Sequence, residues 1–263
     1  FLSLVGGSHA FVIGGKSAAG HLYPRNSHKP WHQHSARSSV SSTLQLHMMA
    51  ASSSSSNIRL VTNTQCPFAQ KAWIALRVKQ VELEIDEISL YGPNGKPDWF
   101  WNLNPQGTVP VLVVSSSSYH DKKTIVVTDS DDILNELDDI VGNTNGQNNI
   151  LLYPSDIAVE EIETWRQERI NQKLLPLGQQ AVLAHQLTPP LQSVLQEMDR
   201  AVVGPFLLGS HVTAADCHAF PFVWRLQQEF DLTPYPQLHA WLQTCGELPA
   251  FAKTIQTSWW WWW

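Results

Sequence analysis

The chain has 263 residues, which is long enough for one large domain or two small ones around a buried core. Hydrophobic residues make up 43% of it and charged residues 15%, so the composition excludes a wholly disordered protein, and no apolar run is long enough to predict a membrane span. The net charge of -6 argues against a nucleic-acid-binding protein, and three cysteines are too few for a disulfide framework.

The charge is unevenly divided along the chain. Residues 1–57 contain four basic residues and no acidic residue, whereas the remaining residues carry 13 basic and 23 acidic ones. A basic, serine-rich, acid-poor segment is typical of an organelle transit peptide. Its apolar start and the step from Ala10 to Phe11 fit the end of a signal-peptide core with its cleavage site. We therefore expect a disordered targeting leader similar to the bipartite plastid leaders of algae, with another organelle, the secretory route, the cytoplasm or no targeting role as alternatives.

The next segment predicts a strand, a helix and a second strand. Residues 58–64 alternate between apolar and polar, as a half-buried strand does, and residues 81–88 do the same. Between them Pro67 suits the first turn of a helix, in which one face carries Phe68, Ala72, Ala75 and Leu76. Strand, helix and strand of this length predict a right-handed βαβ unit.

Further strand and helix signals complete an N-terminal domain. We expect a short helix around residues 97–103, strands at 109–114 and 124–128, and a helix that Asp129 or Ser130 caps. The order βαβ followed by ββα predicts an α/β thioredoxin-like domain over residues 58–141.

The second half of the chain reads as helical. Residues 142–153 predict a linker that is rich in Gly and Asn, and residues 154–258 show helical spacing without strand signals, which predicts an all-α domain. Thr213 and Asp216 form a capping box that begins one of its helices. The five tryptophans at 259–263 fit neither a helix face nor a strand face, and we assign them no function.

Cys66 is the residue with the clearest chemical potential. It lies between the end of a strand and the start of a helix, where unpaired N–H groups and the helix dipole favour an anion. This position predicts a lowered pKa and a nucleophilic thiolate, with a buried structural cysteine as the alternative. In a Cys-x-x-Cys motif that began at Cys66, the second cysteine would stand at position 69, which is Ala69 here. A redox cycle at Cys66 therefore requires an external thiol. Cys217 and Cys245 lie within predicted helices and are expected to be packing residues.

Several motifs in register resemble one enzyme family. The motifs are Cys66-Pro-Phe-Ala-Gln-Lys71, Lys96-Pro-Asp-Trp-Phe-Trp101, Asn104-Pro-Gln-Gly-Thr-Val-Pro-Val-Leu112, Thr128-Asp-Ser130, the set Asp216, Pro221 and Arg225, and the closing segments 235–241 and 248–251. Together they are similar to cysteine-type glutathione S-transferases, above all the omega class, with its dehydroascorbate reductase and lambda relatives. The resemblance covers about residues 58–255.

The resemblance implies a glutathione site around Cys66. Cys66 would form a mixed disulfide with glutathione, and Phe68 would line the same pocket. Val109 precedes Pro110, which the family holds in cis, so that the Val109 main chain pairs with the cysteinyl part of glutathione. The alternatives are that Phe68 is only a core residue and that the proline is an ordinary trans proline.

The resemblance also implies contacts to the two ends of glutathione. Asp129 would bind the ammonium of the γ-glutamyl group and Ser130 its carboxylate, although most relatives have Glu in place of Asp129. Lys96 matches a basic residue that approaches the glycine carboxylate. The alternatives are a helix cap for Ser130 and a solvated surface lysine for Lys96.

Three helical residues are candidates for the acceptor site. In the family, the positions of Trp165, Trp224 and Arg225 border the cleft for the second substrate, which would admit flat or oxidised organic molecules. The alternative is that these residues belong to the core of the helical domain.

The sequence thus predicts a glutathione-dependent thiol transferase or reductase, with glutathione as co-substrate, no metal and a small organic or disulfide acceptor such as dehydroascorbate. Two other readings remain open: a binding protein of the same fold that holds hydrophobic ligands or a protein partner without turnover, and a soluble relative of the chloride intracellular channel proteins. The apolar insertion segment of the channel proteins is not visible in the sequence. A homodimer is usual in the family and is left open.

Overall fold

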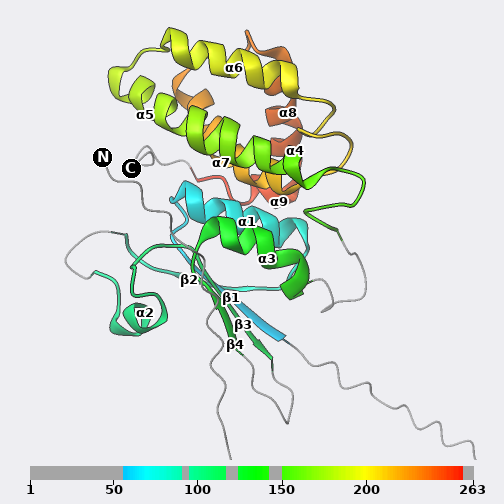
Figure 1. Ribbon diagram of the computed structural model, residues 1–263. Coiled ribbons are helices and arrows are strands. Elements are labelled where there is room, and N and C mark those ends of the chain that lie inside the picture. Colours follow the sequence, from blue (N-terminus) through cyan, green and yellow to red (C-terminus); the bar gives the residue numbers. More distant parts are fainter. Residues whose placement is uncertain (1–55, 91–94, 117–123, 142–149, 257–263) are drawn as a thin grey trace, which may run out of the picture.

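The computed structural model describes residues 56–90, 95–116, 124–141 and 150–256. A four-stranded sheet forms one end of the molecule, and a bundle of helices forms the other, with α1 and α3 between them (Figure 1). The expected leader up to residue 55, the first part of the linker (142–149) and the tryptophan run lie outside the described residues.

The N-terminal elements follow the predicted order. They are β1 (Ser56–Thr62), α1 (Pro67–Val78), β2 (Glu84–Glu87), α2 (Asp98–Leu103), β3 (Val111–Ser116), β4 (Thr124–Val127) and α3 (Ser130–Val141). The α/β thioredoxin-like prediction is confirmed. The second strand begins later than predicted, because the N–H of Val81 donates to the carbonyl of Leu76 at 3.1 Å and Gln80 has a positive φ of 55°. Val81 therefore closes the turn that ends α1 and does not join the strand.

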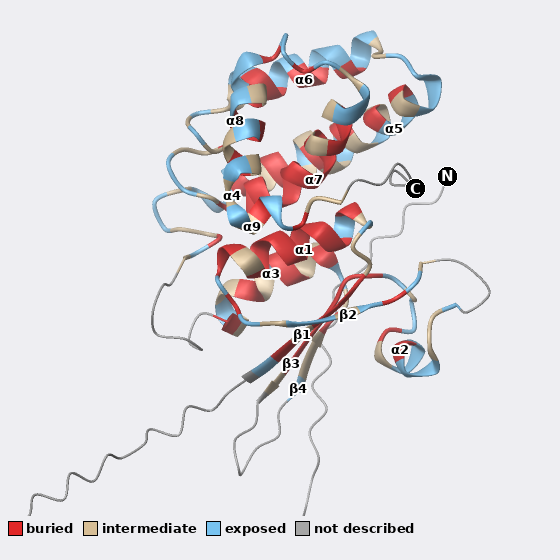
Figure 2. Ribbon diagram, turned by 180° about the vertical axis from the view of Figure 1, so that it is seen from behind, coloured by how far each residue is buried: buried red, intermediate tan, exposed pale blue. Residues whose placement is uncertain are grey.

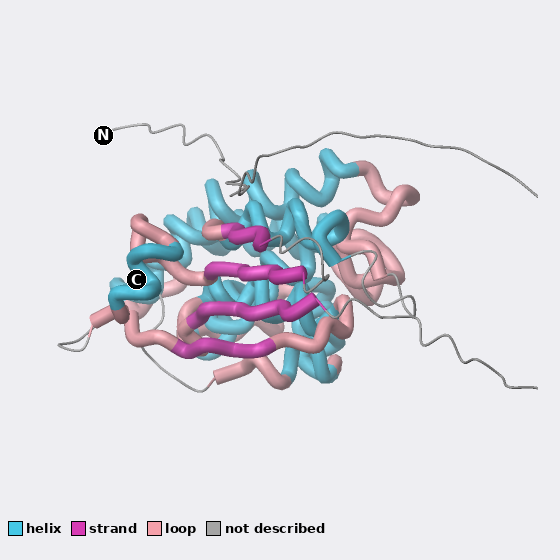
Figure 3. Tube along the Cα trace, turned by 90° about the horizontal axis from the view of Figure 1, so that it is seen from below, coloured by secondary structure: helices cyan, strands magenta, loops and turns pink. Residues whose placement is uncertain are grey.

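The sheet has the order β2-β1-β3-β4 (Figure 3). β1 and β2 are parallel, whereas β3 runs antiparallel to both β1 and β4. Val61 pairs with Val111, and Leu112 pairs with Val127. The carboxyl ends of β1, β2 and β4 therefore meet the start of β3 at a single edge of the sheet.

Both faces of the central strand β3 are buried, which explains its continuous apolar run. Leu112 and Val114 pack in the core that α1, α3 and the helical domain share. Val111 and Val113 point to the other face and pack with Phe100 of α2. In Figure 2 α1 is largely coloured as buried, so α1 is an interior helix between the sheet and the helical domain.

The predicted all-α domain is also confirmed, with one unexpected element. Its helices are α4 (Val159–Glu163), α5 (Leu175–Ala184), α6 (Pro189–Ala201), α7 (Ala214–Glu229), α8 (Pro236–Glu247) and α9 (Pro249–Ala252). A π-helix, η1 (Thr164–Leu174), joins α4 to α5 and was not predicted. Apolar spacing alone does not separate a π-helix from an α-helix, because both can bury one side.

The predicted capping box begins α7. The N–H and the hydroxyl of Thr213 donate to the Asp216 carboxylate at 2.8 and 2.9 Å. The same carboxylate accepts the indole N–H of Trp241 at 2.8 Å and the N–H of Leu207 at 2.9 Å. Asp216 therefore ties α7 to α8 as well as capping it. Within the described ranges, no helix is long and apolar enough to cross a membrane.

Candidate active site

The topology gathers the predicted glutathione residues at the sheet edge described above. Cys66 follows β1, Val109 and Pro110 precede β3, and Asp129 and Ser130 follow β4. Their chain positions are far apart, but the strand register brings all three segments to one edge. The helices α1 and α3 both begin there, so two helix N-termini point toward this edge, a setting that favours negatively charged groups.

Cys66 is the N-cap residue of α1, and its carbonyl accepts the N–H of Gln70 at 2.9 Å. Burial raises the pKa of the Cys66 thiol, although hydrogen bonds from the N–H groups of Ala69 and Phe68 and the charges of Arg225 and Lys71 act in the opposite direction. The prediction of a lowered pKa is therefore wrong for this structure. The N–H groups at the start of α1 do stabilise the thiolate, but burial excludes water and destabilises the thiolate by a larger amount.

Arg225 of α7 is a charged residue of the helical domain that acts on this thiol. The residue is 2% exposed, and its guanidinium donates to the carbonyls of Gln65 at 3.2 Å and Pro221 at 2.9 Å, and to the Gln70 side chain. Burial lowers the pKa of Arg225 to about 10, while the charge of Cys66 raises it. Arg225 therefore binds the main chain of Gln65, the residue that precedes Cys66. The family resemblance had instead suggested that Arg225 borders the acceptor cleft.

Gln70 completes this connection between the two domains. Its amide N–H group donates to the carbonyl and the hydroxyl of Thr254 at 3.2 and 3.0 Å, while its oxygen accepts from Arg225. All three side chains are buried. The start of α1 is therefore fixed from α7 and from the segment after α9.

Phe68 lies in the first turn of α1, Val109 lies just before β3, and Lys96 lies just before α2. Phe68 is 42% exposed and meets the Phe222 ring edge-on at 5.3 Å, so it is not a core residue. The Val109–Pro110 peptide bond is cis. The Lys96 ammonium donates to the carbonyl of Leu90 at 3.4 Å and lies 5.8 Å from the Trp101 ring, so it is held at the end of β2.

The sequence left open whether Asp129 or Ser130 caps α3, and the structure assigns the cap to Asp129. The Asp129 carboxylate accepts the N–H of Asp131 at 2.7 Å and that of Asp132 at 3.4 Å, so Asp129 is the cap of α3. Ser130 is the first residue of the helix and is buried. Its hydroxyl is therefore not needed as the cap.

The two tryptophans of the expected acceptor site differ from each other. Trp165 is 1% exposed and lies within the core of the helical domain, with the Arg169 guanidinium 4.8 Å from its ring. This burial does not support a place for Trp165 in a substrate cleft. Trp224 is half-buried on α7 and lies 5.7 Å from the Arg225 guanidinium, so it remains available as a lining residue.

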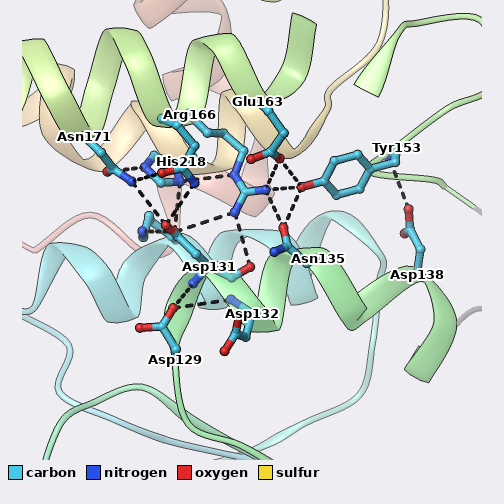
Figure 4. Close-up of polar contacts among 12 residues, drawn as sticks. Asp129, Asp131, Asp132, Asn135, Asp138, Tyr153, Glu163, Arg166, Asn171 and His218 are labelled. Atoms are coloured by element: carbon cyan, nitrogen blue, oxygen red, sulfur yellow. Dashed lines mark hydrogen bonds and ion pairs between the residues drawn. The ribbon is translucent and has the colours of Figure 1, made fainter. Parts of the chain in front are cut away.

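A buried charge cluster lies beside the site, between α3 and the helical domain (Figure 4). Its centre is Asp131, whose carboxylate lies 2.5 Å from the Lys71 ammonium, 3.6 Å from the Arg166 guanidinium and 3.3 Å from His218 Nδ1. Burial alone would raise the pKa of Asp131, but His218 and Lys71 outweigh it and hold the pKa well below its usual range. Burial lowers the pKa of Lys71, and Asp131 opposes this effect. We call these four side chains the Asp131 cluster.

His218 has polar neighbours at both ring nitrogens. Nδ1 lies 3.4 Å from Arg166 Nε and 3.3 Å from the Asp131 carboxylate, and Nε2 lies 3.0 Å from Asn171 Oδ1. Burial lowers the pKa of His218 to about 3, which favours a neutral ring near pH 7. Arg166 also pairs with Glu163 at 2.5 Å, so η1 carries the cation into the interface and the end of α4 carries its partner.

Sequence reasoning missed the Asp131 cluster and the Gln70 connection. The available signal was that α1 carries Gln70 and Lys71 in an otherwise apolar segment, next to the motif around Cys66. Cys217 and Cys245 are buried, and burial raises the pKa of each well above the ordinary value, which suits packing residues. Among the described residues, no group of His, Cys, Asp and Glu side chains could hold a metal ion.

Family models match both halves of the chain. Residues 65–140 match the model "Glutathione S-transferase, N-terminal domain", and residues 180–244 match "Glutathione S-transferase, C-terminal domain". Together these segments span just over half of the chain.

Individual relatives agree with these matches. "Glutathione S-transferase L1" from Arabidopsis thaliana is 26% identical over 74% of this chain and 81% of its own length. "Probable glutathione transferase omega-2" from Caenorhabditis elegans is 26% identical over 77% of this chain and 82% of its own length. The crystal structure of a glutathione transferase homolog from Lodderomyces elongisporus, with two GSH per subunit, has a TM-score of 0.58 at 22% identity and covers 75% of this chain and 97% of its own.

Proposed function

We propose that this chain, which belongs to the glutathione S-transferase family, is an omega-like thiol transferase or reductase with Cys66 as its nucleophile. One observation carries the proposal. A lone cysteine caps the N-terminus of α1 at the same sheet edge where the cis Val109–Pro110 bond and the start of α3 lie. A Ser or Tyr nucleophile, as in a conjugating enzyme, does not occupy this position.

The edge offers complementary groups for each part of glutathione. The γ-glutamyl carboxylate would lie at the N-terminus of α3 beside Ser130, and its ammonium would lie near Asp129. The main chain of Val109 would pair with the cysteinyl residue as an added strand does. Lys96 would approach the glycine carboxylate from the end of β2. This orientation places the glutathione sulfur at Cys66.

The reaction then proceeds as two thiol–disulfide exchanges. The Cys66 thiolate attacks the glutathione sulfur of a mixed disulfide, the Cys66–glutathione bond forms, and the acceptor leaves as a thiolate that takes up a proton. A second glutathione, as its thiolate, attacks the sulfur of the bound glutathione and releases oxidised glutathione and free Cys66. The net change is that one glutathionylated acceptor and one free glutathione give the free acceptor thiol and oxidised glutathione. With dehydroascorbate as acceptor, two free glutathiones supply the two electrons and two protons.

The environment of Cys66 controls the rate of the first step. Because burial raises its pKa, only part of the thiol is ionised near neutral pH, and the charges of Arg225 and Lys71 increase that fraction. Arg225 is therefore a positioning and electrostatic residue in this mechanism. It also fixes Gln65 and Gln70 on either side of the nucleophile.

The test is an activity assay with three matched proteins. Wild type, Cys66→Ser and Cys245→Ser are assayed for glutathione-dependent reduction of dehydroascorbate and of a small glutathione mixed disulfide. We expect Cys66→Ser to lose at least about 100-fold in kcat/KM, since serine cannot form the mixed disulfide, and Cys245→Ser to retain activity. Mass spectrometry of the wild type should show one added glutathione on Cys66. Equal inactivity of all three proteins, together with retained binding of glutathione, would refute the enzyme proposal.

One observation favours the alternative of a non-catalytic binding protein. The raised pKa of Cys66 lowers its thiolate fraction, and a protein that only holds glutathione does not need the thiolate. The same assay separates the two functions, because the binding protein retains glutathione affinity but shows no turnover with either acceptor.

We also propose that residues 1–57 direct the protein to a plastid. The support is their composition, with four basic residues, no acidic residue and 14 serines. N-terminal sequencing of the protein purified from its source tests this. An N-terminus well before Gly20 would argue against a leader that is removed in two steps.

A further inference from the structure

Asp131, in the first turn of α3, is bonded through both its main chain and its side chain. Its N–H donates to Asp129 Oδ1 at 2.7 Å, and its carbonyl accepts from the Arg166 guanidinium at 3.2 Å. One carboxylate oxygen, Oδ1, takes part in the ion pairs of the Asp131 cluster. The other, Oδ2, accepts the side-chain amides of Asn171 at 3.2 Å and Gln167 at 3.4 Å. Asp131 therefore has little freedom to rotate.

The π-helical geometry of η1 brings the residues on this side of Asp131 together. In a π-helix the main-chain hydrogen bonds join residues five apart, so residues at this spacing lie on nearly the same side. Arg166 and Asn171 have this spacing, whereas an α-helix of 3.6 residues per turn would point them about 140° apart. Gln167, next to Arg166, accepts the Asn171 amide at 2.9 Å. The π-helix, which the sequence did not predict, thus presents one guanidinium and two amides to α3.

The N–H of Asp131 reaches the residue that would bind the ammonium of glutathione. The Asp129 carboxylate accepts the N–H groups of Asp131 and Asp132 at the same oxygen, Oδ1. Asp129 is exposed, so its other oxygen can meet a cationic group of a ligand. In Figure 4 the dashed lines run from Asp129 through Asp131 to Asn171. Hydrogen bonds therefore connect η1 of the helical domain with the expected γ-glutamyl site at the sheet edge.

The charge of Asp131 does not require the two amides. The Lys71 ammonium is already paired at Oδ1. Asn171 and Gln167 are only partly buried, so water could bond to Oδ2 in their place. What the side-chain amides add over water is a fixed direction, because a carboxylate that protein groups hold at both oxygens cannot turn. The two amides therefore act on the orientation of Asp131 more than on its charge.

We propose that Asn171 and Gln167 of η1 are positioning residues for glutathione, which hold Asp131 so that Asp129 faces the ammonium of the γ-glutamyl group. This inference rests on the proposed function, because it needs glutathione to bind at the sheet edge. It goes further in assigning part of the glutathione affinity to side chains of the helical domain. The physical reason is preorganisation, since a site whose groups are already oriented loses less freedom when the ligand binds.

The test measures binding without turnover. S-methylglutathione, whose blocked sulfur cannot form a disulfide, is titrated by calorimetry into the full chain. We expect Asn171→Ala to raise the Kd by about three- to tenfold and Gln167→Ala, which loses a longer contact, by about two- to threefold. Gln172→Ala removes an exposed amide from the same π-helix and should leave the Kd unchanged.

A second ligand separates positioning of Asp129 from a general loss of structure. S-methyl-glutaryl-cysteinylglycine lacks only the amino group, so it has nothing for the Asp129 carboxylate to bind. Asn171→Ala should change its Kd by less than about twofold, because the contact that Asn171 orients is absent. Equal losses for the two ligands would overturn the proposal, and so would an unchanged Kd for S-methylglutathione or an equal change in Gln172→Ala.

The outcome is independent of turnover. If wild type binds S-methylglutathione in the expected pattern but reduces neither acceptor, the proposed enzymatic function fails and the role of Asn171 stands. If wild type turns over and Asn171→Ala binds S-methylglutathione as tightly as wild type, the role of Asn171 fails and the enzymatic function stands.

Discussion

Replacing Asp131 by Asn should destabilise the fold strongly, because it leaves Lys71 as a buried cation without a counter-charge. The Lys71 side chain is 2% exposed, and its only ion pair among the described residues is the 2.5 Å contact with Asp131. Arg166 depends less on Asp131, because Glu163 lies 2.5 Å from its guanidinium and Asn135 also accepts a hydrogen bond from it. The effect of the substitution is thus concentrated on Lys71.

Its magnitude follows from the cost of breaking one buried ion pair. Removing one partner of such a pair costs about 3–5 kcal/mol, since the other charge stays buried. For a folded part of roughly 200 residues, this corresponds to a fall in Tm of about 6–20 °C. The double variant Asp131→Asn with Lys71→Met removes the uncompensated charge, and we expect it to recover at least about half of the loss.

The assay is urea unfolding followed by tryptophan fluorescence, with Asp139→Asn as the control. Asp139 lies on the same helix, α3, but is exposed, so the same substitution there should change the free energy of unfolding by less than about 0.5 kcal/mol. If Asp131→Asn stays within about 1 kcal/mol of Asp139→Asn, or if the double variant is no more stable than Asp131→Asn, Asp131 does not compensate the charge of Lys71.

The pH dependence gives a second check on the same reasoning. Burial already lowers the pKa of Lys71, and the loss of Asp131 lowers it further because the opposing contact is gone. The unfolded chain then binds one proton more than the folded one over a wider pH range, so stability rises with pH up to the ordinary lysine value near 10.5. The difference in the free energy of unfolding between wild type and Asp131→Asn should therefore become smaller between about pH 7 and pH 10. If this difference in the free energy of unfolding grows over the same range, Asp131 does not compensate the charge of Lys71.

Three more predictions concern the interface and the sheet edge. Arg225→Met should slow alkylation of Cys66 by iodoacetamide at pH 7 by about tenfold and move its pH profile upward, since a cation that lowers the thiol pKa is lost; an unchanged profile would contradict this. His218 has a folded pKa of about 3 against 6.5 when exposed, so wild type should lose about 2 kcal/mol of stability from this group between pH 7 and pH 5, and urea unfolding of His218→Gln should show that loss removed. Gly107→Ala should lower the free energy of unfolding by about 1–3 kcal/mol, because φ is 70° and the new Cβ would lie 2.6 Å from the Trp101 ring, whereas Gly246→Ala, with open space around it, should not lower it.

The position of the site was predictable from the sequence because local signals fix it. Cys66 follows a run of alternating residues and precedes Pro67, so its place between a strand and a helix follows from periodicity and backbone chemistry. Asp129 also follows a strand. It was one of the two residues predicted to cap α3, and it does so. Once the strands are ordered, both residues must lie at the same edge.

The environment of the site was not predictable, because it depends on how the two domains pack. The helix N-terminus predicted a lowered pKa for Cys66, whereas burial under the helical domain raises it. Helical spacing marked Trp165 as apolar but gave no information on which side of the domain it faces, and it lies in the core. Arg225 is separated from Gln65 by 160 residues, so no local pattern connects them.

The same packing explains why α1 is tied both to the helical domain and to α3. An interior helix has no solvent for its polar side chains, so each must find a partner in a neighbouring element. Gln70 finds Thr254 and Arg225, and Lys71 finds Asp131. Arg77, the other charged side chain of α1, lies in its last turn and is only partly buried, so its charge does not depend on an ion pair in the interior.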